Sequence, residues 1–255
     1  MRALVLFAGL LAGLVGVTRS VSDAAAADKP TLNVFLPVDV KSSVIEKALQ
    51  THLPGLNVVV FGRFRDFESA LTAHRPDAVL ALEPLLAAQH ISPTMRGYAE
   101  GHDSEKYVLL SAGSAPLEGS LSGKTIGVVD FLGRNDTQTF MAAALKTPDI
   151  RSKLVTKQED LLSLLTFSAA DAVLIPSAAV KTFAERSRLT FHVREVPGLQ
   201  VGLAAVGVLR PEARTQVIRA IEALSTTNVL NVRRAREKFG VRDGALDRVD
   251  QVVDQ

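Results

Sequence analysis

Small polar residues gather in three turns that follow strand-like runs of this 255-residue chain. Such turns lead into helix starts, where free backbone N–H groups bind anions and Ser, Thr and Asn side chains add directed donors. The chemistry they predict is the capture of a small anionic or zwitterionic solute. The residues are Asp39, Ser42 and Ser43 in the first turn, Arg134, Asn135, Asp136 and Thr137 in the second, and Ser177 in the third.

Each of these residues also has a simpler interpretation. Ser42, Asn135 and Thr137 can cap their own helices. Arg134 can pair with an anion through two parallel hydrogen bonds or face solvent. Asp39 and Glu83 could share a cleft, but nothing in the sequence assigns them acid and base roles. We therefore treat both carboxylates as candidate ligand-binding residues and predict no catalytic residue.

The common catalytic and metal-binding motifs are missing from the sequence. The five histidines are dispersed, and the absence of cysteine excludes thiolate metal sites and cysteine nucleophiles. Gly123-Lys124-Thr125 is similar to the end of a phosphate-binding P-loop, but a strand-like run follows where a helix must begin. The sequence thus predicts no enzyme, no metal and no cofactor.

The first 27 residues have the layout of a cleavable export signal. Arg2 precedes the apolar run Ala3–Val17, and an A-x-A site at Ala25–Ala27 follows. The run is shorter than the ~20 residues that span a bilayer. We therefore expect a periplasmic protein without stable membrane insertion after cleavage. Its charges are interspersed and sum to +2, which does not favour nucleic-acid binding.

The candidate residues must be positioned by two sets of alternating strands and helices. Strand-like runs are found at residues 32–36, 56–61 and 78–82, and again at 125–130, 154–156 and 172–175, with helical periodicity between them. This order predicts an α/β protein of two lobes, each a mostly parallel sheet flanked by helices. Residues 28–112 are assigned to the first lobe, 113–197 to the second, and 198–255 to a return with C-terminal helices. The lobes look alike in organisation, without a residue-level repeat.

Two segments resemble type II periplasmic solute-binding proteins, most closely the phosphate/phosphonate-type branch of ABC transporter receptors. They are Pro76–Pro84 (PDAVLALEP) and Leu121–Asp130 (LSGKTIGVVD). The resemblance implies a monomer whose lobes close on a solute and then dock on an ABC permease. It places Ser42 and Ser43, and Asn135, Asp136 and Thr137, at the two anion-binding helix starts.

The ligand is less clearly indicated than the fold. Residues 133–137 (GRNDT) depart from the Ser/Thr/Gly-rich phosphate loop of that branch. Asp39, Glu83 and Asp136 would repel phosphate unless the ligand also carries an amine. Two alternatives to a transport receptor stay open. One is an exported sensory or scaffold protein, which an apolar cleft would favour, and the other is an exported enzyme without a short motif.

Overall fold

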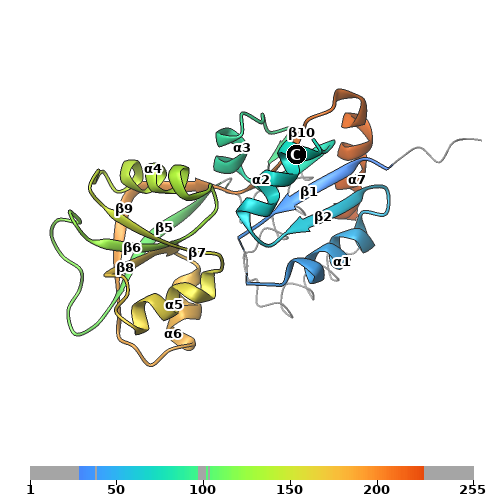
Figure 1. The fold of residues 1–255 in the computed structure, drawn as a ribbon. Helices are drawn as coiled ribbons and strands as arrows, with labels where there is room; N and C mark the ends of the chain where they lie inside the picture. The colour runs from blue at the N-terminus through green and yellow to red at the C-terminus, as the bar shows by residue number, and fades with distance from the viewer. Residues whose placement is uncertain (1–28, 38, 97–101, 103, 227–255) are drawn as a thin grey trace, which may run out of the picture.

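The computed structural model describes residues 29–37, 39–96, 102 and 104–226, and they form two lobes side by side (Figure 1). The predicted signal peptide and the helix expected after Asn228 lie outside these residues. None of the described helices is both long enough and apolar enough to span a bilayer.

The first lobe is built on a five-stranded sheet in the order β2-β1-β3-β10-β4. Strand β1 pairs in parallel with β2 and β3, whereas β10 runs antiparallel to β3 and β4. The strands are β1 (Thr31–Phe35), β2 (Asn57–Phe61), β3 (Ala78–Leu82), β4 (Met95–Arg96) and β10 (Ala204–Val208).

Helices cover both faces of this sheet, so β3 is buried along its whole length. Ile45 and Leu49 of α1, together with its C-cap residue Leu53, fall on one side, as their spacing predicts, and all three are buried against one face. The helices are α1 (Ser42–His52), α2 (Phe64–Ala73), α3 (Glu83–Ala88) and α7 (Arg214–Thr226), with a 3₁₀ turn at Pro211–Ala213 before α7.

The second lobe repeats this plan with the strand order β7-β6-β8-β5-β9. Its parallel pairs are β6 with β7 and β6 with β8, and β5 is antiparallel to both neighbours. The strands are β5 (Ser104–Ala112), β6 (Thr125–Val129), β7 (Arg151–Val155), β8 (Ala172–Pro176) and β9 (Phe191–Gly202). The helices are α4 (Arg134–Ala144), α5 (Gln158–Thr166) and α6 (Ala179–Glu185). The predicted two-lobed α/β class is confirmed.

The lobe boundaries differ from those expected. Strand β5 was assigned to the first lobe, but it pairs with β8 and β9 in the second sheet. Pro197-Gly198 was interpreted as the return crossing, but it lies inside β9, where the register against β5 shifts. An edge strand tolerates proline and a bulge. The second connection therefore falls at Gly202–Ala204, and the first falls between β4 and β5.

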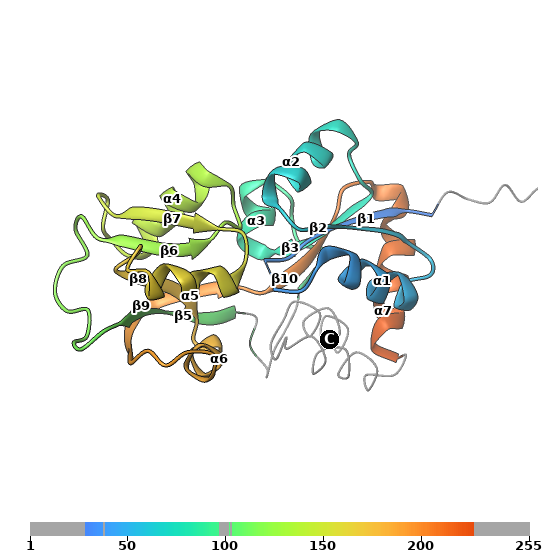
Figure 2. The same cartoon turned by 60° about the horizontal axis from the view of Figure 1, so that its bottom comes forward.

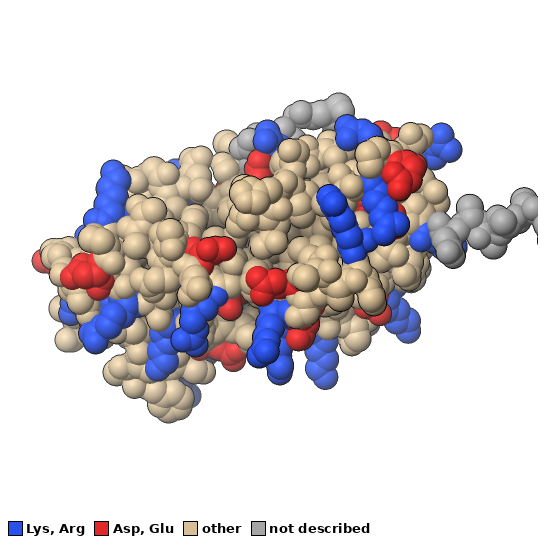
Figure 3. All heavy atoms as spheres, turned by 45° about the horizontal axis from the view of Figure 1, so that its top comes forward, with Lys and Arg blue, Asp and Glu red and all other residues tan. Residues whose placement is uncertain are grey.

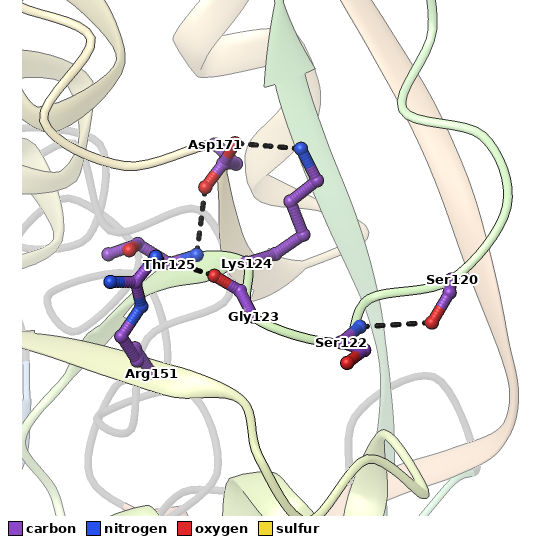
Figure 4. Close-up of polar contacts among 7 residues, drawn as sticks. All are labelled: Ser120, Ser122, Gly123, Lys124, Thr125, Arg151 and Asp171. Atoms are coloured by element: carbon purple, nitrogen blue, oxygen red, sulfur yellow. Dashed lines mark hydrogen bonds and ion pairs between the residues drawn. The ribbon is translucent and has the colours of Figure 1, made fainter.

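A short sequence repeat, which was not predicted, fixes where each sheet begins. Asp77 and Asp171 each precede an Ala-Val-Leu strand. Thr31 N–H donates to Asp77 Oδ2 at 2.7 Å, and Asp77 N–H donates back to the Thr31 carbonyl oxygen at 3.0 Å. In the second lobe Thr125 N–H donates to Asp171 Oδ2 at 2.8 Å (Figure 4). The return bond, from Asp171 N–H to the Thr125 carbonyl oxygen, is also 2.8 Å.

A glutamine repeats in the same manner. In the first lobe Gln50 accepts from Val58 N–H at 3.0 Å and donates to the Leu56 carbonyl oxygen at 2.7 Å. In the second lobe Gln138 accepts from Ser152 N–H at 3.1 Å and donates to the Ile150 oxygen at 2.8 Å. Equivalent glutamine side chains thus join a helix to the neighbouring strand within each lobe.

Basic side chains support both aspartates. Arg210 Nε is 3.6 Å from Asp77 Oδ1, and Lys124 Nζ is 3.2 Å from Asp171 Oδ1. Partial burial acts to raise the pKa of Asp171, but the Thr125 N–H bond and nearby cations outweigh it and lower the pKa. This carboxylate therefore stabilises the fold above its unfolded-state pKa, and the contribution is lost as pH falls through the lowered folded-state value.

We expect Asp77→Ala and Asp171→Ala to destabilise the protein by similar amounts, about 1 kcal/mol each, because each leaves a strand N–H without its charged acceptor. Urea unfolding should show lower midpoints with an unchanged slope. Glu68→Ala, which alters an exposed α2 side chain, is the control. If both aspartate variants unfold at the same midpoint as the control, Asp77 and Asp171 do not stabilise the starts of the two sheets.

Candidate functional site

The carboxyl ends of the parallel strands in the two lobes face each other. Asp39, in the turn after β1, reaches the start of α5, and Phe64, at the start of α2, reaches the turn after β6. Figure 2 shows the two sheets in line, with α3 at the boundary between them. Ligands of open α/β sheets bind beyond these strand ends. The candidate site is therefore the region where the two sets of turns meet.

Asp39 is a predicted site residue that the structure brings into contact with the opposite lobe. Its Oδ1 accepts the backbone N–H of Glu159 at 2.9 Å, and its Oδ2 is 3.8 Å from Arg186 Nη1. Burial raises the pKa of Asp39, and the charge of Glu159 adds to the rise, whereas the Glu159 N–H bond and Arg186 oppose it. The carboxyl group is thus half-buried among groups of both signs.

Apolar side chains occupy much of the boundary between the lobes. A single buried cluster joins residues of α2 and α3 to residues of β6 and α4. Phe35 stacks on Phe67 with ring centroids 5.5 Å apart, and Phe64 meets Phe35 edge-on at 5.9 Å. Members from the first lobe include Phe35, Phe64, Phe67 and Leu85, and members from the second include Phe131, Leu132 and Met141.

The second predicted turn contains a glycine that packs closely against the other lobe. Gly133 has φ +86°, and a Cβ placed on it would lie 2.6 Å from the Phe64 ring. Arg134, Asn135 and Asp136 are exposed in the first turn of α4. Apolar periodicity predicts a helix start near Gln138, but α4 begins four residues earlier, at Arg134, because the exposed first turn carries no apolar signal.

Thr137 is enclosed within its own loop. It is completely buried, its Oγ1 accepts Leu132 N–H at 3.2 Å, and it donates to Asp130 Oδ1 at 3.3 Å. Its hydroxyl therefore holds the β6–α4 turn in shape. This contact supports the structural alternative for Thr137 more than direct solute binding.

The three serines lie at helix starts without capping bonds. Ser42 and Ser43 open α1, whose N-cap is Lys41 and makes no side-chain hydrogen bond. Ser42 is half-buried beside Gly62, and Ser43 is exposed. Ser177 is exposed before α6, and its N–H donates to the Lys106 carbonyl oxygen at 2.9 Å. Their proposed role in binding solute stays a prediction.

Glu83 lies at the connections between the lobes. Its Oε1 is 2.9 Å from Arg96 Nη2 at the end of β4, and its N–H donates to the Leu203 carbonyl oxygen at 2.9 Å. A Cβ on Gly202 would lie 2.7 Å from Glu83 Oε2. Glu83 therefore touches residues that adjoin both connections between the lobes, and its proposed role in binding solute stays a prediction.

Four residues at this boundary were not identified from the sequence. Phe64 and Gly133 pack together, while Glu159 and Arg186 bind Asp39. Gly133, in the turn after β6, was the one available signal, since a glycine there marks a positive φ or a close approach. The pairing of residues 120 positions apart has no signal in a single sequence.

Charge is mixed on the face of the molecule drawn in Figure 3, where acidic and basic side chains are interspersed without a broad surface of one sign. Within the described residues no group of three or more His, Asp or Glu side chains is placed to hold a metal ion.

Comparisons with known proteins show the fold. No protein-family model and no curated protein matches the sequence. Solved structures that are similar include a putative L-cystine ABC transporter protein from Listeria monocytogenes (14% identity, 86% of this chain and 98% of that chain, TM-score 0.59). Another is the substrate-binding protein of an amino acid ABC transporter (16% identity, 89% of this chain and 99% of that chain, TM-score 0.53). A third is a histidine kinase sensor domain similar to periplasmic binding proteins (16% identity, 83% of this chain and 95% of that chain, TM-score 0.55). The chain thus has the two-lobed type II periplasmic-binding-protein fold.

Proposed function

We propose that this protein captures a small zwitterionic solute of the amino-acid class between its two lobes. The observation that carries the proposal is the meeting of opposed strand ends, where Asp39 contacts Glu159 and Phe64 contacts Gly133 across the boundary. A solute held there touches both lobes, so its binding favours closure.

The chemistry of the boundary favours an amine over a phosphate. Asp39, which is half-buried where the lobes meet, offers a carboxylate to an ammonium group. A phosphate would meet like charge from Asp39 and Glu159. Two of the similar structures are described as proteins of amino acid or cystine transporters. The phosphate/phosphonate specificity suggested by the sequence resemblance has no comparable support.

Transport is the leading context within this proposal. A signal peptide over residues 1–27 would place the protein in the periplasm, where it would deliver its solute to an ABC permease as a monomer. The continuous apolar cluster between the lobes favours a second candidate, a sensory or scaffold module of the same fold. One of the similar structures is a kinase sensor domain.

Thermal unfolding of residues 28–255 in the presence of single solutes tests the proposal. The panel contains the amino acids, phosphate, phosphonates, sulfonates and short polyamines. A ligand at about a hundred times its dissociation constant adds about 2.7 kcal/mol of stability. For a protein of this size that is a rise in melting temperature of roughly 5–10 °C. A response to phosphate alone would contradict the amino-acid class, and no response at all would favour the sensory or scaffold candidate.

A further inference from the structure

Asp39 supplies a partner that α5 lacks within its own lobe. The N-cap residue Lys157 makes no side-chain capping bond, and the Glu159 N–H is one of the first-turn groups without an intrahelical acceptor. Asp39 Oδ1 accepts it at 2.9 Å from the opposite lobe. Since the contact joins separate lobes, it forms only when they are close together.

The groups around Asp39 act on its charge in opposite directions. The positive end of the α5 dipole, Arg186 and Lys157 favour the carboxylate. Burial and the Glu159 carboxylate disfavour it. A neutral carboxyl group keeps an oxygen that accepts the Glu159 N–H, without the cost of a buried charge. The hydrogen bond therefore survives protonation, while the main opposing effect is removed.

We propose that Asp39 is an interlobe latch that holds α5 through the Glu159 N–H and holds it more firmly when its carboxyl group is protonated. The latch regulates the same cleft and rests on the proposed closure of the lobes. In the closed arrangement burial raises the pKa of Asp39, and separation of the lobes returns the group to water and toward its ordinary pKa. The closed arrangement binds more protons, so lowering the pH through the raised pKa favours closure.

Interlobe distances measured by pulsed electron paramagnetic resonance test the latch. The chain has no cysteine, so Lys47→Cys on α1 and Ala184→Cys on α6, both exposed, provide the only two labelling sites. Without added solute, acidification from neutral pH should increase the short-distance population. The Asp39→Asn variant, which keeps a hydrogen-bond acceptor but no charge, should be closed at both neutral and acidic pH. Asp39→Ala should lower the closed-to-open ratio roughly fivefold, the effect of one lost hydrogen bond.

Asp66→Asn on α2 is the control, because this exposed carboxylate is remote from α5 in sequence and makes none of the interlobe contacts described above. Urea unfolding of each labelled variant establishes that it is folded. Interlobe distances that change neither with pH nor with substitution of Asp39 would overturn the latch. Solute binding is measured separately, by thermal shift, so the two proposals can fail independently. A melting temperature that rises with solute, together with interlobe distances that do not depend on Asp39, would exclude only the latch. Distances that depend on Asp39, without any response to solute, would exclude only the proposed function.

Discussion

Replacing Phe67 by alanine is expected to lower the free energy of unfolding by about 3–5 kcal/mol, the usual cost of deleting a buried aromatic side chain. Phe67 is completely buried on the inner side of α2. Its ring lies 5.5 Å from Phe35 and 5.8 Å from Phe61, measured between centroids. The substitution would remove the ring shared by these contacts and leave a cavity beneath the site.

Phe167→Ala is the matched control, since the same atoms are removed from a side chain that is 79% exposed. Its effect should be within about 0.5 kcal/mol of zero. Chemical unfolding of both variants, with equal slopes, gives the comparison directly. Equal midpoints for the two variants would show that Phe67 is not the centre of the aromatic cluster.

Gly133→Ala is expected to destabilise the protein by about 1–3 kcal/mol and to weaken solute binding, because two costs coincide at this residue. An alanine would have to adopt φ near +86°, a left-handed conformation that L-residues disfavour. Its Cβ would also lie 2.6 Å from the Phe64 ring of the other lobe. The second cost acts only in the closed arrangement, so the lobes should separate.

Gly119→Ala separates the two costs. Gly119 has a similar φ of +72° but has no atom within 4 Å of a built Cβ. It should therefore lose stability without moving the lobes. Adding Phe64→Leu to Gly133→Ala should restore part of the closed population, because the ring edge is removed. Interlobe distances that are identical in the Gly119 and Gly133 variants would exclude the contact with Phe64.

The sequence predicted the elements because each carries a local signal. The i, i+4, i+8 spacing of Ile45, Leu49 and Leu53 located α1, and continuous apolar runs located β2 and β3. The residues of Tyr107–Ser111 predicted a strand, which is part of β5, but it was assigned to the first lobe. Its membership depends on antiparallel pairing with β8 and β9. Pairing over such separations leaves no mark in one strand's own residues.

The binding roles expected for the site residues stay predictions, but their contacts in the structure differ. The turns after β1 and β6 each reach the opposite lobe, at the starts of α5 and α2 respectively. Asp39 makes such a contact, while Thr137 is occupied within its own turn. Both residues gave the same sequence signal, a small polar side chain near a helix start. What separates them is burial and partner choice, which depend on the tertiary arrangement. The aromatic character of the boundary was likewise hidden among eleven dispersed phenylalanines.

Small-angle scattering of residues 28–255 with and without the solute that most raises the melting temperature tests the central claim most directly. Closure of two lobes on a solute predicts a smaller radius of gyration in its presence, and Gly133→Ala should diminish that change. An unchanged radius at saturating solute would contradict binding coupled to closure, even if the melting temperature still rises.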